Sequence, residues 1–95
     1  MAAFIVFSRE KTRDKAELDA YGVLAGKSMA GHAAIPRAIY GLHETLEGAA
    51  TEGVVILEFA TFDEAKAWYS SPAYTEARAQ RLKGADYRVM IVEGI

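Results

Sequence analysis

The sequence contains no cysteine, and this absence excludes disulfides, thiolate metal ligands and a cysteine nucleophile. Its two histidines, His32 and His43, match no metal-binding spacing, so we expect no metal site. A glycine-rich loop that would hold phosphate groups is also missing. The sequence therefore predicts no cofactor.

An excess of basic residues and a long apolar run are missing as well. The net charge is −2 with a pI near 5.6, which gives no general attraction to nucleic acids or anionic membranes. The first residues, MAAFIVFSREK, have no basic leader, and their apolar run is only as long as a strand. We therefore expect a cytoplasmic protein with no signal peptide, no membrane span and no nucleic-acid partner.

What the chain does have is enough apolar sequence for one core. Its 95 residues predict a single domain over 1–95. The hydrophobic fraction of 52% is slightly high for a domain of this size. Such an excess favours an apolar surface that is buried against a second copy of the chain.

Local signals predict three helices. Asp14 begins a helix over about 15–29, which contains Gly22 and Gly26; these two residues either allow a close backbone approach or weaken the helix. Thr61, three residues before a glutamate, begins a helix at position 62. Ser71 and Pro72 end that helix and begin another, which runs to about 83. Gly84 then predicts a left-handed end.

The apolar runs between these helices predict four strands. Two of them, 3–8 and 54–59, are apolar on both faces, and a less regular one covers 37–44 after Pro36. A polar loop over 45–53 and a last strand over 87–93 complete the order. This order predicts an α+β, ferredoxin-like βαββαβ fold, in which a four-stranded antiparallel sheet carries its helices on one face and the second helix is split at Ser71-Pro72.

The stretch 58–74 also resembles the domain-of-unknown-function family 1330. The matching residues are Glu58, Phe59, Ala65, Trp68, Tyr69, Ser71, Pro72 and Tyr74, with further positions at Leu46-Glu47-Gly48, Arg81 and Val92-Glu93-Gly94. The resemblance implies a ferredoxin-like domain that pairs into a dimeric α+β barrel, and it implies no reaction. Relatives tend to have an Arg-Gly-Gly run in the second strand, and the nearest arginine here is Arg37. If that arginine holds an anionic ligand in relatives, the role is lost here or has moved to Arg37.

An acid–base set is one hypothesis for the site. His43 and Glu58, each at a strand end, are the candidate catalytic residues, because an imidazole titrates near neutrality and burial makes a carboxylate more basic. The alternative is that both are ordinary polar strand ends. A structural ion pair between Glu58 and Arg81 is expected if Glu58 is buried. Arg9, Lys11 and Arg13 precede a helix N-terminus, but neighbouring acidic residues favour solvation of their charges.

An aromatic pocket is the other hypothesis. The predicted ligand-binding residues are Arg37, Tyr40, Trp68, Ser71, Tyr74 and Arg81. Aromatic residues at helical spacing are also typical of a hydrophobic core, and both interpretations remain open.

The sequence thus favours a homodimer that binds a small molecule in a cavity of the barrel. The alternative function is a cofactor-independent enzyme, oxygenase- or isomerase-like, that uses His43 and Glu58 as acid–base groups. Whether the chain is an enzyme stays open at this point.

Overall fold

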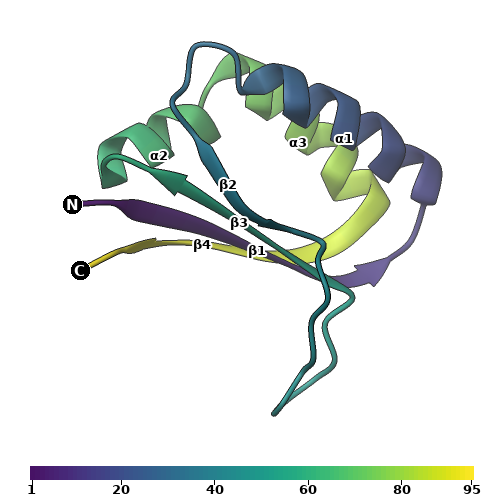
Figure 1. Ribbon diagram of the computed structural model, residues 1–95. Helices are drawn as coiled ribbons and strands as arrows, with labels where there is room; N and C mark the ends of the chain where they lie inside the picture. Colours follow the sequence, from purple (N-terminus) through teal and green to yellow (C-terminus); the bar gives the residue numbers. More distant parts are fainter.

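The computed structural model describes residues 1–95 and has the predicted element order. The elements are β1 (Ala3–Thr12), α1 (Lys15–Ser28), β2 (Ile35–Ile39), β3 (Gly53–Phe59), α2 (Phe62–Tyr69), α3 (Pro72–Gly84) and β4 (Ala85–Glu93). All strand pairs are antiparallel, and the sheet order is β2-β3-β1-β4. The three helices cover one face of the sheet (Figure 1). This is the predicted ferredoxin-like fold with a divided second helix.

Each helix begins at its predicted capping residue. The Asp14 side chain accepts hydrogen bonds from the first turn of α1, at 3.1 Å from the nearer backbone nitrogen. Thr61 Oγ1 lies 3.1 Å from a backbone nitrogen of α2, and Ser71 Oγ lies 3.2 Å from one of α3. These caps satisfy N–H groups that have no partner within a helix, so local sequence alone sets the helix starts.

The predicted left-handed end at Gly84 is wrong. Gly84 is the last residue of α3, its φ is not positive, and the chain continues directly into β4. A Cβ atom at Gly84 would lie 2.9 Å from two side-chain atoms of Leu18, and the Gly84 carbonyl accepts hydrogen bonds from the backbone nitrogens of Arg13 and Asp14. Glycine is therefore required here because α1 approaches closely.

Two strands differ from their predicted bounds by more than two residues at one end, and β4 begins at Ala85 instead of residue 87. β1 continues past Ser8 to Thr12, because its charged end pairs with β4. The second strand is Ile35–Ile39 instead of 37–44, since Tyr40 adopts a left-handed backbone with a φ of 51° and ends the strand. Pro36 lies inside β2, which is tolerated because β2 is an edge strand.

The core lies between the sheet and the helices. Its fully buried hydrophobic residues are Ala3, Ile5, Phe7, Leu57, Phe59, Ala65, Trp68, Tyr74 and Ala77. Trp68, 1% exposed, packs edge-on against Phe7 and donates a 3.1 Å hydrogen bond from Nε1 to the buried Ser28 Oγ. This contact ties α2 to the end of α1.

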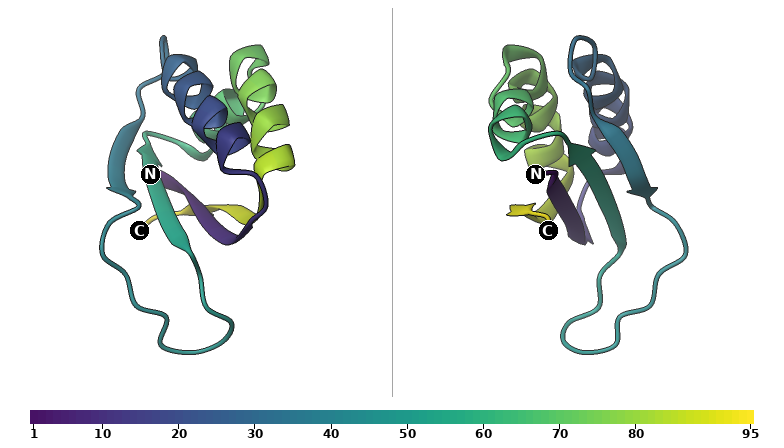
Figure 2. Two further views of the ribbon diagram at one scale, coloured as in Figure 1. Left: turned by 90° about the vertical axis from the view of Figure 1, so that its right-hand side faces the viewer. Right: turned by 60° about the vertical axis from the view of Figure 1, so that its left-hand side comes forward.

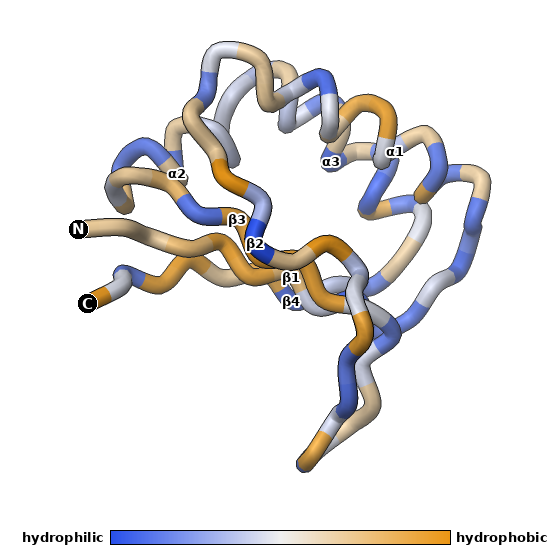
Figure 3. The backbone as a smooth tube through the Cα atoms, viewed as in Figure 1, coloured by the Kyte–Doolittle hydropathy of each residue, from blue (hydrophilic) through white to orange (hydrophobic).

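The opposite face of the sheet carries no helix and has an apolar middle row. One cross-strand row on this face consists of Ala38, Ile56, Val6 and Met90, from four neighbouring strands. Met90 is 44% exposed, and the strands of the sheet are largely hydrophobic in Figure 3. β3, which the sequence suggested is buried on both faces, is therefore covered on only one face within a single chain.

The segment 40–52 between β2 and β3 is the most protruding part of the molecule. Figures 1 and 2 show that it extends beyond the sheet, away from the helices. Every residue of 41–50 is exposed, including Leu42 and Leu46. None of the helices is long and apolar enough to cross a membrane.

Candidate functional site

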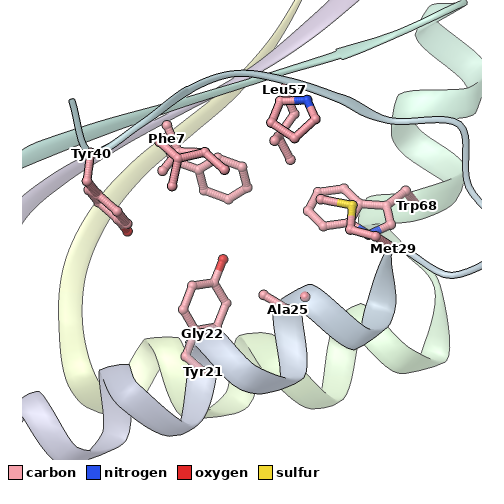
Figure 4. A pocket seen from close by; sticks show the side chains of 12 residues that line it. Phe7, Tyr21, Gly22, Ala25, Met29, Tyr40, Leu57 and Trp68 are labelled. Carbon is pink, nitrogen blue, oxygen red and sulfur yellow. The ribbon is translucent and has the colours of Figure 1, made fainter.

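A pocket of about 320 Å³ lies between α1 and the part of the sheet formed by β1, β3 and β2. Its walls are mainly apolar (Figure 4). The lining residues are Phe7, Tyr21, Gly22, Ala25, Gly26, Met29, Pro36, Ile39, Tyr40, Val55, Leu57 and Trp68. This volume is at the lower end of the range for small-molecule sites, so the pocket suits a compact ligand.

Small residues of α1 keep this pocket open. Gly22, Ala25 and Gly26 lie on the face of the helix that lines the pocket. No atom lies within 4 Å of a Cβ built at Gly22 or Gly26. No other segment of the backbone therefore packs closely against these two glycines. The absence of their side chains leaves open space next to the helix.

Tyr40 forms the wall opposite α1 in a strained conformation. It is the only non-glycine residue with a positive φ, which bulky side chains rarely adopt. A Cβ at Gly53 would lie 2.5 Å from Tyr40 Cδ1, so the ring packs directly on the backbone of Gly53. The Arg9 guanidinium lies 4.8 Å from the centre of the same ring. These contacts hold the Tyr40 ring at the pocket wall.

Two tyrosine hydroxyl groups give the pocket one polar end. Figure 4 shows the hydroxyl groups of Tyr21 and Tyr40 directed into the pocket. Tyr21 Oη lies 2.8 Å from Tyr74 Oη, and Tyr40 Oη lies 2.6 Å from Tyr87 Oη. Burial, together with the neighbouring tyrosine in each pair, raises the pKa of both Tyr21 and Tyr40 well above the usual value. Both hydroxyls stay protonated, so they can donate hydrogen bonds but cannot act as tyrosinate bases at neutral pH.

Arg81 lies behind this polar end as a buried cation. Its side chain is on α3, and the residue is 4% exposed. One of its amino groups donates to Tyr69 Oη at 3.4 Å, and its Nε has no hydrogen-bond partner. The guanidinium lies 5.1 Å from the ring centre of Tyr87 and 6.0 Å from that of Phe7. No carboxylate pairs with Arg81, which leaves its charge uncompensated within the chain.

The structure brings half of the predicted site residues together. Tyr40 and Trp68 line the pocket, and Tyr74 and Arg81 lie behind its polar end. Ser71 caps α3 and donates a 2.7 Å hydrogen bond to the Trp68 carbonyl, so both of its hydrogen-bonding roles are used in the backbone. Trp68 is a core residue and a pocket residue at once.

The predicted acid–base residues lie elsewhere in the chain. His43 is in the exposed segment 40–52, where its Nε2 lies 2.8 Å from the Thr51 carbonyl oxygen. Glu58 is near the far end of β3 and pairs with Arg37 at 2.9 Å, instead of with Arg81 as expected. A single chain therefore does not bring His43 and Glu58 together, and neither lines the pocket.

Several residues of the site were not among the site residues predicted from the sequence. They are Tyr21, Gly22, Gly26, Tyr87 and Arg9. Arg9 was expected to be solvated, but it pairs with Glu52 at 3.3 Å and covers Tyr40. The two glycines, spaced by four on an amphipathic helix, were the available signal for a cavity wall.

Metal ligands do not cluster in the structure. No three His, Asp or Glu side chains come together in a way that could hold a metal ion. His32 and Glu64 line a second, smaller pocket of about 210 Å³ near the end of α1, but the two are not joined by a hydrogen bond or ion pair.

Known structures share this fold over nearly its whole length. A protein of unknown function from Rhodopseudomonas palustris is 16% identical, with a TM-score of 0.76, and the match covers 99% of this chain and 82% of that one. SnoaB, a cofactor-independent oxygenase from Streptomyces nogalater, is 11% identical, with a TM-score of 0.69 and coverage of 99% and 93%. A dimeric ferredoxin-like protein of unknown function from Thermobifida fusca is 13% identical, with a TM-score of 0.66 and coverage of 97% and 90%. At these identities the likeness shows the fold alone.

Sequence comparison gives the family. No curated protein matches the chain. Residues 2–95 match the model of a domain of unknown function, DUF1330, which confirms the resemblance that the stretch 58–74 indicated. Since the match covers nearly every residue, the chain belongs to the DUF1330 family of domains of unknown function.

Proposed function

We propose that this protein binds a small, mainly apolar molecule in the pocket between α1 and the sheet. The observation that carries this proposal is an open apolar space next to a helix whose glycines leave it unfilled. Ligand pockets combine apolar walls with a few placed polar groups, and this one has the hydroxyl groups of Tyr21 and Tyr40.

We also propose that the protein is a homodimer in which two helix-free sheet faces pack against each other to form the barrel. Relatives of the same fold are described as dimeric. The face is apolar along the row that ends at Met90, and an antiparallel sheet with such a face has to be covered. The segment 40–52 projects on the same side, where its exposed Leu42 and Leu46 can contact the second copy.

A cofactor-independent enzyme is the second candidate. The likeness in fold to SnoaB favours it, and protonated hydroxyl groups in an apolar pocket can stabilise negative charge that develops on a substrate oxygen. His43 and Glu58 lie outside the pocket of their own chain, so their use as acid–base groups requires action across the dimer interface. The distinguishing result is turnover of a bound compound in the presence of oxygen without added cofactor.

Trp68 provides the binding assay, because it is the only tryptophan and it lines the pocket. We expect small uncharged ring compounds, such as indane, to change Trp68 fluorescence in a saturable way. Gly22→Leu should abolish this change by placing a side chain in the pocket, whereas Val23→Leu, on the exposed face of the same helix, should not. Equal binding by both variants would place the ligand elsewhere.

The dimer is tested separately by sedimentation. Met90→Glu puts a charge on the helix-free face and should shift the protein to monomers, because a desolvated unpaired charge is costly. Leu82→Glu, at an exposed position of α3, is the matched control and should leave the mass unchanged. A wild-type protein that is monomeric at micromolar concentration would contradict the proposed dimer.

A further inference from the structure

Arg81 is unusual among the arginines of this protein because it is buried without a carboxylate. Arg9, Arg13 and Arg37 each form an ion pair with an acidic side chain. Arg81, at 4% exposure, has no such partner, and its Nε is unsatisfied. A buried charge without a counter-ion is strongly unfavourable, so an anion supplied from outside the chain is expected to compensate it.

The hydrogen bonds around Arg81 lead from its guanidinium to the pocket. Burial raises the pKa of Tyr74, while the hydrogen bond with Tyr21 and then the charge and hydrogen bonding of Arg81 oppose this rise. A guanidinium can only donate hydrogen bonds, so the tyrosine oxygens that face Arg81 act as acceptors. The Tyr74 and Tyr21 oxygens lie 2.8 Å apart and either can be the donor, so an anion in the pocket can orient the pair with Tyr74 donating to Tyr21 and Tyr21 donating to the ligand.

This orientation of the hydrogen bonds would give the polar end of the pocket a donor. With Tyr74 donating to the Tyr21 oxygen, the Tyr21 proton points to the ligand. Tyr40 reaches the same end and is hydrogen-bonded to Tyr87, whose ring faces the Arg81 guanidinium. The lining residues include no aspartate or glutamate that would repel an anion.

We propose that the ligand of this pocket is a small ring-containing molecule with one negatively charged oxygen group, such as a carboxylate, enolate or phenolate. The oxygen group accepts hydrogen bonds from Tyr21 and Tyr40, and the apolar part lies against Gly22, Gly26 and Trp68. Arg81 is a positioning residue, since it acts through the tyrosines and supplies the positive charge behind them. This inference rests on the proposed binding function and specifies the chemical class of the ligand.

Contacts with aromatic rings stabilise the Arg81 charge in part, but they do not do so as fully as an anion would. The ring faces of Tyr87 and Phe7 attract the guanidinium, but neutral rings cannot neutralise its net charge. Arg9 also lies near the polar end, over the Tyr40 ring, but its charge is already paired with Glu52. Arg81 is therefore the cation at this end that an anionic ligand would balance.

The test uses two probes with one carbon skeleton, 3-phenylpropionate and 3-phenylpropan-1-ol, measured by Trp68 fluorescence and calorimetry on the purified protein. We expect the anion to bind about tenfold more tightly than the alcohol, because a charge-assisted hydrogen bond is stronger than a neutral one by about this factor in affinity.

Variants of the arginine test the source of this preference. Arg81→Met should remove the preference for the anion and keep the affinity for the alcohol, and Arg81→Lys should restore part of the preference. Arg78→Met, on the same helix, should leave the preference unchanged. Tyr21→Phe should weaken the preference as well, and it provides an independent test if Arg81→Met does not fold.

The outcomes separate this inference from the proposed function. Equal binding of the two probes by the wild-type protein would overturn the anion site and leave the apolar pocket standing. An anion preference that survives both Arg81→Met and Tyr21→Phe would also overturn it. Binding of neither probe, together with no effect of Gly22→Leu on uncharged compounds, would overturn the proposed function itself.

Discussion

Replacing Gly22 or Gly26 by alanine should make the protein more stable, although both residues lie in the wall of its pocket. Glycine in a helix interior costs about 1 kcal/mol relative to alanine. No atom lies within 4 Å of the added Cβ at either position, so no steric cost offsets this gain. We expect each change to raise the free energy of unfolding, measured in urea, by about 1 kcal/mol. For a domain of this size, each kcal/mol corresponds to a rise of roughly 4–8 °C in Tm.

The same substitution at Gly84 or Gly53 is the matched control, with the opposite sign. There the added Cβ would lie 2.9 Å from Leu18 and 2.5 Å from Tyr40, respectively, and such overpacking costs about 1–3 kcal/mol. If Gly22→Ala and Gly26→Ala destabilised the protein as much as these controls, the face of α1 toward the sheet would be packed. The argument for an open pocket would then fail.

Three further changes test other parts of the structure. Ser71→Ala removes the cap of α3 and should lower the free energy of unfolding by about 1 kcal/mol, measured in urea; an unchanged midpoint would contradict the capping role. The hydrogen bond from Thr12 lowers the pKa of Glu52, so the stabilisation that Glu52 gives is present at neutral pH and is lost as the pH falls through the lowered pKa. Glu52→Gln should therefore lose less stability on acidification than the wild type, and parallel unfolding curves for the two proteins would refute this. Changing Leu42 and Leu46 together to serine should alter unfolding of the single chain by less than about 0.5 kcal/mol but weaken the dimer in sedimentation; unchanged assembly would exclude the projecting segment from the interface.

The parts of the fold that the sequence predicted correctly depend on neighbouring residues. Asp14, Thr61 and Ser71 each cap a helix through atoms two or three positions away, and such contacts can be seen in the sequence. The errors arose where distant segments intervened. Gly84 carried a typical helix-end signal, but contact with Leu18 and the direct passage into β4 determine its conformation.

The pocket was predictable only in part for the same reason. Tyr40 and Trp68 were recognised as aromatic candidates, but their partners are far away in the chain. The Tyr21–Tyr74 hydrogen bond joins residues 53 positions apart, and the Tyr40–Tyr87 bond joins residues 47 positions apart. No periodicity within one element indicates such pairs, so the polar end of the pocket depends on tertiary structure.

Three locally unfavourable features meet at this pocket. Tyr40 has a backbone conformation that bulky residues avoid, two glycines weaken α1, and Arg81 is buried without a counter-ion. Each lowers stability on its own, and folding alone requires none of them, since smaller or apolar residues would remove the cost. Strained or unsatisfied groups tend to gather where a protein binds or transforms a ligand. Their convergence on one apolar space indicates that this part of the protein was selected for binding a ligand and not for stability.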